Sequence, residues 1–219
     1  MNVVFDLDGT LLNTIDDLGF ACNYALEKRG YPTHPISAFE AMVGNGINML
    51  IRRALPEEVR TDELVAELRK DFVQYYNAHN CDYTRPYPGI KELLHELKAK
   101  GHHLAVASNK YHEATEKIID HFFPNTFDVV LGEREGIPRK PDPRIVQDIL
   151  AKMPEIPEII TSESSTLFIG DSLVDRDTAR NAKLRFAACS WGFVARHELV
   201  KAGIETIVDS PAEILLLVS

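Results

Sequence analysis

The stretch Val3-Val4-Phe5-Asp6-Leu7-Asp8-Gly9-Thr10, close to the start of the chain, decides the fold. Its apolar residues end abruptly at an aspartate, which is typical of a buried strand that carries acidic residues at its carboxyl end. In open parallel sheets, ligands bind in the crevice outside the carboxyl ends of the strands. The stretch therefore predicts a functional site directly after the first strand.

The next part of the chain, residues 14–83, has helical spacing and no convincing strand. Ile15, Leu18, Cys22 and Ala25 recur at steps of three and four, and Gly30 follows as a stop. Further helices are expected over residues 37–43, over residues 47–54 and from residue 62 onward. The apolar face of the last helix is expected to consist of Leu64, Leu68, Phe72 and Tyr75.

Beyond residue 83, strands and helices alternate. Strands are expected over residues 104–107, 127–131, 166–169, 185–189 and 206–208. Helices are expected over residues 90–100, 112–121, 143–153 and 212–218, and residues 154–165 are expected to form an exposed connection. Such alternation indicates a parallel sheet with right-handed crossovers. The predicted fold class is α/β, with a doubly wound, Rossmann-like parallel sheet that is interrupted after its first strand by a helical insertion.

Composition and charge exclude several functions. Of the 219 residues, 45% are apolar and 26% are charged, as in ordinary soluble globular proteins. The formal net charge of −9 argues against nucleic-acid binding, since that depends on Lys and Arg neutralising phosphates. No basic run exceeds Arg52-Arg53, and the longest aliphatic run, residues 214–218, is far too short to span a bilayer. We therefore expect no nucleic-acid partner and no membrane, whereas a small anionic substrate is compatible with this charge.

The cysteines and the N-terminal residues bear on the compartment. Cys22, Cys81 and Cys189 are widely spaced and form no Cys-x-x-Cys motif, so neither a zinc site nor a disulfide framework is indicated. Reduced thiols of this kind are typical of the cytosol. The N-terminal residues contain no positive region and no long apolar stretch, so no signal peptide is expected. These features predict a cytoplasmic protein.

Polar residues stand at three strand ends and one helix start. Asp6 and Asp8 follow the first strand, Ser108 and Asp171 follow two later strands, and Lys140 stands where a helix begins. Three clustered carboxylates would repel one another without a cation, and Mg²⁺ suits them because it prefers oxygen ligands. Lys140 adds a fixed positive charge, and the Ser108 hydroxyl can hold phosphoryl oxygens. This set predicts phosphoryl transfer, in which positioning and charge neutralisation supply most of the catalysis.

The same residues form motifs that occur together in one family. Asp6-Leu7-Asp8-Gly9-Thr10, Ser108, Lys140 before Pro141, and Gly170-Asp171 with Asp175 appear in that order. The chain resembles the haloacid dehalogenase superfamily in its phosphatase branch, over essentially its whole length, and the helical insertion resembles the helical cap of that family. The resemblance implies a core of residues 1–13 and 84–219 and a helical cap of residues 14–83.

A finer resemblance is to phosphoglycolate phosphatases. It rests on residues 43–46 (VGNG), 87–89 (YPG), 107–110 (ASNK) and 190–193 (SWGF). Two departures occur: Asn13-Thr14 stands where that subgroup has Asp-Ser or Asp-Thr, and Ala182-Lys183-Leu184 replaces a common Ala-Gly. Neither departure removes a residue of the four motifs.

The resemblance also implies roles for individual residues. Asp6 is expected to be the nucleophile and a metal ligand. Asp8 is expected to act as general acid and then as general base, with its backbone carbonyl on the metal. Ser108 and Lys140 are expected to bind the phosphoryl group, with Lys140 also orienting Asp6. Asp171 is expected to bind Mg²⁺ directly or through a water, and Asp175 to position Lys140 or a metal-bound water. Further substrate-binding positions are expected at Thr10, Asn109 and Gly46.

The predicted function is a Mg²⁺-dependent phosphatase that hydrolyses a small, phosphoglycolate-like phosphomonoester through an aspartyl-phosphate. Alternatives on the same core are a sugar-phosphate mutase similar to β-phosphoglucomutase, a pyrophosphatase, and a non-catalytic regulatory protein. A mutase is less favoured because no clear basic residue follows Thr14. A dehalogenase is disfavoured because that branch lacks the second aspartate of the first motif. The sequence leaves open whether the protein is a monomer or a dimer.

Overall fold

A six-stranded parallel sheet forms the centre of the molecule. The computed structural model describes residues 1–154 and 166–218, so the connection predicted over residues 154–165 lies, except for its first residue, outside the described residues. The strands are β1 (Asn2–Phe5), β4 (His103–Tyr111), β5 (Val129–Glu133), β6 (Thr166–Gly170), β7 (Arg185–Cys189) and β8 (Ile207–Val208), in the order β5-β4-β1-β6-β7-β8. All neighbouring pairs in this sheet are parallel.

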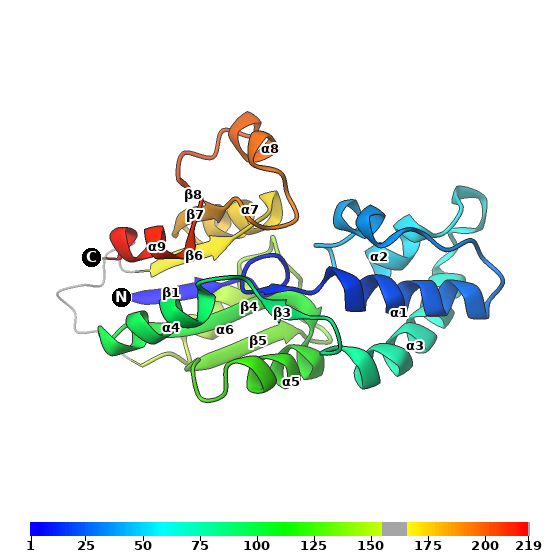
Figure 1. Ribbon diagram of the computed structural model, residues 1–219, viewed down its shortest axis with the longest axis horizontal. Coiled ribbons are helices and arrows are strands. Elements are labelled where there is room, and N and C mark those ends of the chain that lie inside the picture. Colours follow the sequence, from blue (N-terminus) through cyan, green and yellow to red (C-terminus); the bar gives the residue numbers. More distant parts are fainter. Residues whose placement is uncertain (155–165, 219) are drawn as a thin grey trace.

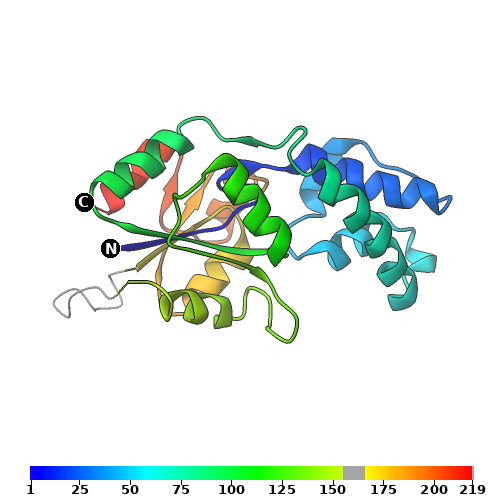
Figure 2. The same ribbon diagram turned by 90° about the horizontal axis from the view of Figure 1, so that it is seen from below.

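Helices cover both faces of this sheet (Figure 2). Phe5 points to the face covered by α4 (Ile90–Ala99), α5 (His112–Phe122) and α9 (Pro211–Leu217), and its neighbour Val4 points to the face of α6 (Arg144–Leu150) and α7 (Leu173–Asn181). Successive strand residues point to opposite faces, so an uninterrupted apolar strand such as β1 must be buried on both sides. The prediction of a doubly wound α/β core is confirmed.

A helical insertion between β1 and β4 forms a separate body beside the sheet (Figure 1). Its elements are α1 (Ile15–Lys28), the 3₁₀ helix η1 (Ile36–Ala41), α2 (Ile47–Ala54), the 3₁₀ helix η2 (Glu57–Val59) and α3 (Asp62–His79). We call residues 15–79 the cap. Its α1 and α3 lie side by side and bury Leu26, Phe39, Leu68 and Phe72 completely. The inserted helical body was predicted, whereas the domain boundaries at residues 13/14 and 83/84 stay a prediction.

Two short strands join the cap to the core. Strand β2 (Leu12–Asn13) pairs antiparallel with β3 (Arg85–Pro86), so the outgoing and returning chains are hydrogen-bonded to each other. The buried Asp17 carboxylate reinforces this junction. It accepts hydrogen bonds from the Tyr83 N–H at 3.0 Å, the Thr84 N–H at 2.8 Å and the Thr84 hydroxyl at 2.7 Å. These strands were not predicted, because two residues are too few to show a strand periodicity.

The structure differs from the predicted elements at several places. The helix expected over residues 37–43 is the 3₁₀ helix η1, which follows Pro35. Strand β4 continues past Ser108 to Tyr111, with a shift of register between Ala107 and Tyr111. The buried face of α3 includes Val65 and Tyr76, whereas Leu64 and Tyr75 are only half-buried, because steps of three and four fit neighbouring faces of one helix.

Helix α8 (Arg196–Lys201) was not predicted, since six residues with a single buried side chain, Leu199, show no helical periodicity. None of the helices in residues 1–154 and 166–218 combines the length and the apolar character that crossing a bilayer requires.

The Asp17 junction gives a testable prediction. Asp17→Ala leaves the buried backbone N–H and hydroxyl of Thr84 and the partly buried N–H of Tyr83 without a partner, so we expect the free energy of unfolding to fall by about 2–4 kcal/mol. The measurement is urea unfolding followed by circular dichroism. The control is Asp16→Ala, which changes the half-buried neighbour in the same helical turn and should cost about 0.5 kcal/mol through the helix dipole. Equal losses in both variants would contradict the role given to Asp17.

Candidate active site

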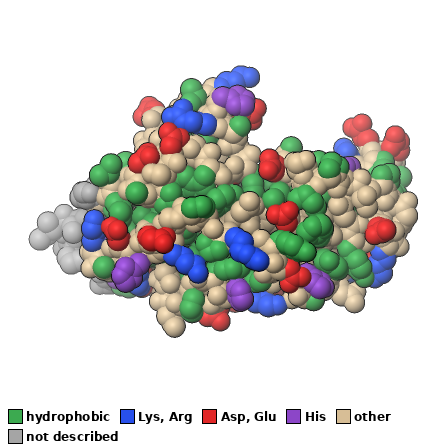
Figure 3. Space-filling model, in the orientation of Figure 1, with side chains coloured by type: hydrophobic (Ala, Val, Ile, Leu, Met, Phe, Trp, Pro, Cys, Tyr) green, Lys and Arg blue, Asp and Glu red, His purple; other side chains and the backbone are tan. Residues whose placement is uncertain are grey.

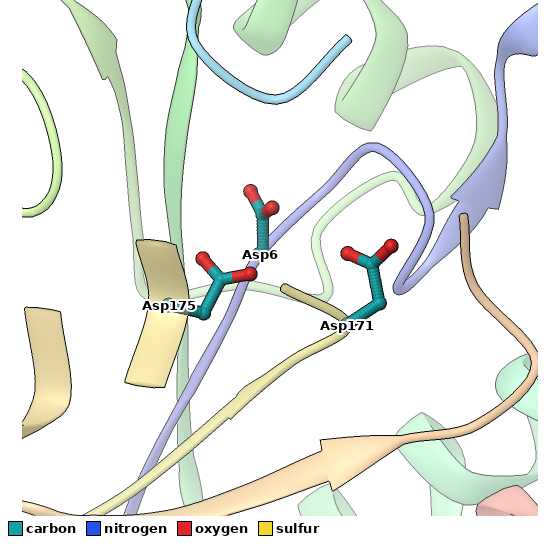
Figure 4. A group of neighbouring side chains, drawn as sticks. All are labelled: Asp6, Asp171 and Asp175. Carbon is teal, nitrogen blue, oxygen red and sulfur yellow. The ribbon is translucent and has the colours of Figure 1, made fainter. Parts of the chain in front are cut away.

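Three buried carboxyl groups meet at the carboxyl edge of the sheet. Asp6 follows β1, Asp171 follows β6, and Asp175 lies in the first turn of α7. One carboxylate oxygen from each lies within 4.8 Å of the other two, and Figure 4 shows the three side chains turned toward a common space. They meet because β1 and β6 are adjacent parallel strands, whose carboxyl ends lie at the same edge.

A buried ammonium group holds two of these carboxylates. The Lys140 Nζ lies 2.8 Å from Asp6 Oδ1 and 2.8 Å from Asp175 Oδ1. The second oxygen of Asp175 accepts hydrogen bonds from the backbone N–H and the hydroxyl of Ser172, which is the N-cap residue of α7. Asp175 is therefore fixed from both ends, and through Lys140 it fixes Asp6.

The charged groups in this cluster shift one another's pKa values. Burial raises the pKa of Asp6 well above its usual range, and the nearby Asp175 charge adds to the effect. Burial and Asp175 likewise raise the pKa of Asp171 to about 7. Burial disfavours the Lys140 ammonium, but the carboxylates of Asp175 and Asp6 outweigh it, so the pKa of Lys140 lies above its usual value. One ammonium does not compensate three buried carboxylates.

This donor set fits a small hard cation. Carboxylate oxygens are the ligands that Mg²⁺ takes in proteins, usually one or two of them together with phosphate and water. Both oxygens of Asp175 are engaged, one of them by the Lys140 ammonium and the other by Ser172. The oxygens of Asp171 each accept one hydrogen bond from an uncharged donor, Oδ1 from the Thr10 hydroxyl at 3.3 Å and Oδ2 from the Phe193 N–H at 2.8 Å, and no ammonium or guanidinium group of the described residues forms an ion pair with it. Asp6 and Asp171 are thus the side chains best placed to hold a divalent metal ion.

The Asp8 side chain faces a different ammonium group. Lys110 Nζ lies 2.8 Å from Asp8 Oδ1 and 3.0 Å from Asp8 Oδ2, and the Thr14 hydroxyl donates to Oδ1 at 2.7 Å. No role was predicted for Lys110, although it follows Ser108 and Asn109 at the end of an apolar strand. The position of Lys110 in the sequence was the signal that could have identified it as a site residue. When a strand continues beyond its apolar residues, every second side chain can point toward the site.

A cavity of about 80 Å³ lies over these residues, between the core and the cap. Its walls include Asp6, Asp8, Ser108, Lys110 and Asp171 from the core and Gly46, Leu50, Phe72 and Tyr76 from the cap. A wider groove of about 550 Å³ shares Gly44, Ser172 and Phe193 with this cavity. Figure 3 shows the surface hollowed between the part of the core that carries α8 and the cap. The groove therefore borders the cavity.

The loop of the cap that contains Gly46 touches the core. The Asn109 amide donates to the Gly44 carbonyl at 3.2 Å, and the Arg139 guanidinium donates to the Asn45 carbonyl at 3.0 Å. Gly46 has a φ of +78°, and a Cβ there would collide with the Arg139 side chain. The contact made by Arg139 was not predicted from the sequence, because the sequence of a cap loop does not indicate which core residue it will contact.

The predicted substrate-binding residues have different positions. Ser108 and Asn109 line the cavity, as does Gly46. The Asn109 side chain also bonds the Lys140 backbone, accepting from its N–H at 2.9 Å and donating to its carbonyl at 3.1 Å. Thr10 is completely buried outside the cavity wall, where its hydroxyl donates to Asp171.

Comparison with known proteins gives a consistent result. Residues 3–189 match the family model of haloacid dehalogenase-like hydrolases. The chain is 33% identical over 218 residues to a phosphoglycolate phosphatase of Cereibacter sphaeroides, covering 97% of this chain and 96% of the relative. It superposes on a crystal structure of a Lactobacillus delbrueckii protein with a TM-score of 0.89 and 32% identity, over 99% of this chain and 97% of the other. A predicted phosphoglycolate phosphatase from Haemophilus somnus gives a TM-score of 0.87 and 28% identity, over the same shares.

The Lys140 cluster generates a prediction about stability. Lys140→Met leaves two buried carboxylates without their ammonium, so we expect a loss of about 3–5 kcal/mol in the free energy of unfolding. Asp175→Asn removes one of those charges, so the double variant Lys140→Met/Asp175→Asn should be more stable than the sum of the single changes by about 1–3 kcal/mol. Urea unfolding of all four proteins at mildly alkaline pH measures this coupling. Strictly additive losses would show that the two groups do not interact.

Proposed function

The chain belongs to the haloacid dehalogenase-like hydrolase family, and we propose that it is a Mg²⁺-dependent phosphatase that hydrolyses a small phosphomonoester of the phosphoglycolate kind. The observation that carries the proposal is the buried group of Asp6, Lys140 and Asp175 beside Asp171. Of these residues, Asp6 and Asp171 line the cavity between the core and the cap, and Lys140 and Asp175 lie behind them. Fixed charges around a small closed space suit phosphoryl transfer, because that reaction depends on positioning and charge neutralisation.

Asp6 is the proposed nucleophile. Its Oδ1 is engaged by the Leu7 N–H at 2.7 Å and by Lys140 at 2.8 Å, so Oδ2 is the oxygen free to attack phosphorus. Attack forms an aspartyl-phosphate bond and breaks the bond between phosphorus and the ester oxygen. Lys140 keeps the attacking carboxylate oriented, and Asp175 keeps Lys140 in place.

Asp8 is the proposed proton donor and acceptor. It protonates the departing ester oxygen, and the resulting carboxylate then takes a proton from the water that attacks the aspartyl-phosphate. That second attack releases inorganic phosphate and restores Asp6. Mg²⁺ held by Asp6, Asp171 and the Asp8 carbonyl would supply positive charge to the phosphoryl oxygens.

The remaining predicted residues fit supporting roles in this proposal. Ser108 and the backbone beside it would hold phosphoryl oxygens, and Thr10 would act through Asp171, to which its hydroxyl donates. Asn109 and Gly46 would shape the substrate end, where the core and the cap loop meet. The cavity of about 80 Å³ favours a leaving group of a few atoms. The free cysteines Cys22, Cys81 and Cys189 agree with the proposed cytoplasmic location.

Metal removal tests the chemistry, and a substrate panel tests the specificity. Hydrolysis of 2-phosphoglycolate should vanish in EDTA and return with Mg²⁺, because the carboxylate cluster needs a divalent cation. Ca²⁺ should inhibit, since its looser and higher coordination spoils the in-line geometry. A panel of phosphorylated metabolites, assayed by phosphate release, ranks the substrates. Full activity in EDTA would contradict the proposed metal requirement. Activity that appears only with a sugar bisphosphate would point to a mutase.

The two aspartates of the first motif are separated by a second experiment. Asp6→Asn should abolish both turnover and the covalent intermediate, because no carboxylate remains to attack phosphorus. Asp8→Asn should retain the nucleophile but lose proton transfer, which contributes about 10²–10⁴-fold per step. With acetyl phosphate, whose leaving group needs little protonation, Asp8→Asn should accumulate one added phosphoryl group in intact-protein mass spectrometry. An adduct on Asp6→Asn would mean that the nucleophile is another residue.

A further inference from the structure

We propose that Lys110 is a positioning residue that holds the Asp8 carboxyl group for proton transfer, and that the cap residue Tyr76 holds Lys110 in that position. The inference rests on the proposed phosphatase function. It assigns a role to a buried lysine, the last residue of the stretch 107–110, and to an aromatic residue of the cap, neither of which was given a role by the sequence. It also identifies the contact through which the cap acts on the chemistry of the core.

The first step is the geometry at Asp8. Lys110 Nζ lies within hydrogen-bond distance of both Asp8 oxygens, at 2.8 and 3.0 Å, and Thr14 donates to Oδ1 at 2.7 Å. Oδ1 therefore has two close donors, and Oδ2 is the oxygen better placed to exchange a proton. An ammonium group can donate to the carbonyl oxygen of a protonated carboxyl group as well as to a carboxylate. Lys110 can thus hold Asp8 in both halves of the reaction.

The second step is the rigidity of Lys110. Its side chain is only 3% exposed, although it carries a full charge. Its backbone N–H donates to the Ser108 hydroxyl at 3.1 Å, and its carbonyl accepts from the Thr115 hydroxyl at 3.2 Å. Gly132 of the neighbouring strand packs so closely that a Cβ there would lie 2.5 Å from the Lys110 carbonyl oxygen. The side chain therefore starts from a fixed point at the end of β4.

The third step is the contact with the cap. Lys110 Nζ lies 4.9 Å from the centre of the Tyr76 ring, at a distance typical of a cation–π interaction. Tyr76 belongs to α3 and is completely buried, with Phe72 stacked on it at 5.4 Å and Tyr111 of the core edge-on at 6.5 Å. The Tyr76 hydroxyl has no hydrogen-bond partner among the described residues. The ring face is therefore what Tyr76 offers to Lys110.

These contacts connect the cap to proton transfer. The ammonium of Lys110 is enclosed between a core carboxylate and a cap ring, so it is fully placed only when α3 lies against the core. The nucleophile Asp6 is held differently, by Lys140 and the Leu7 N–H, which are both core groups. We infer that withdrawal of the cap weakens the positioning of Asp8 while leaving Asp6 in place.

The test compares two substrates of similar size that differ in how much their leaving group needs a proton. Acetyl phosphate releases acetate, which leaves without protonation, whereas ethyl phosphate releases an alkoxide that must be protonated. Lys110→Met should lower kcat/KM, which reports only the steps up to the aspartyl-phosphate, about 10–100-fold more for ethyl phosphate than for acetyl phosphate, a part of the 10²–10⁴-fold that general acid catalysis supplies. Lys110→Arg, which keeps a cation on a long side chain, should recover part of that difference. Tyr76→Leu should show the same selective loss, and Tyr76→Phe should keep the wild-type ratio of the two rates, because it keeps the ring.

Controls separate this inference from a structural effect and from the proposed function. Lys91→Met removes an exposed lysine on α4 and should leave both rates unchanged. Thermal unfolding of each variant measures any general loss of stability, which would lower both rates together. Equal losses of kcat/KM on the two substrates with Lys110→Met would overturn the positioning role. A wild-type protein that hydrolyses neither of these two substrates nor 2-phosphoglycolate with Mg²⁺ would instead refute the proposed function.

Discussion

The ammonium group of Lys140, buried between Asp6 and Asp175, is the interaction on which the rest of the site depends. Taking such charges out of water costs several kcal/mol per ion, and the cost is met only if the partners are placed accurately. Three separate parts of the chain must therefore meet: the end of β1, the loop before α6, and the first turn of α7. Two features bring these parts together: β1 pairs parallel with β6, and Ser172 is the N-cap residue that fixes the start of α7.

Two lysines hold different aspartates of the site. Lys140 binds Asp6 entirely within the core, whereas Lys110 binds Asp8 and also touches Tyr76 of the cap. The group proposed to form the covalent bond is thus held independently of the cap, and the group proposed to move protons is held partly by it. In the proposed mechanism, this arrangement would link completion of the acid–base groups to exclusion of water, which is the usual benefit of a closing lid.

The core and its motifs were predictable because local patterns specify them. An apolar run that stops at Asp6 marks a buried strand, and alternating strands and helices imply a parallel sheet whose carboxyl ends share one edge. Contacts between the cap and the core were not predictable, because a pairing such as Lys110 with Tyr76 depends on how two bodies dock. For the same reason, the contact of Arg139 with the cap loop that contains Gly46 was not predictable. The short strands β2 and β3 were not predicted because their pairing joins segments far apart in sequence.

The charge balance of the site supports the proposal that a divalent cation binds there. Asp6, Asp8, Asp171 and Asp175 face the ammonium groups of Lys110 and Lys140, so full ionisation would leave an excess of negative charge in a buried space. The protein alone does not favour that state, as the pKa of about 7 for the buried Asp171 indicates. A phosphate dianion would add to the repulsion, and the net charge of −9 offers no long-range attraction for it. A divalent cation cancels the excess locally, so binding of the metal and binding of the substrate should favour each other.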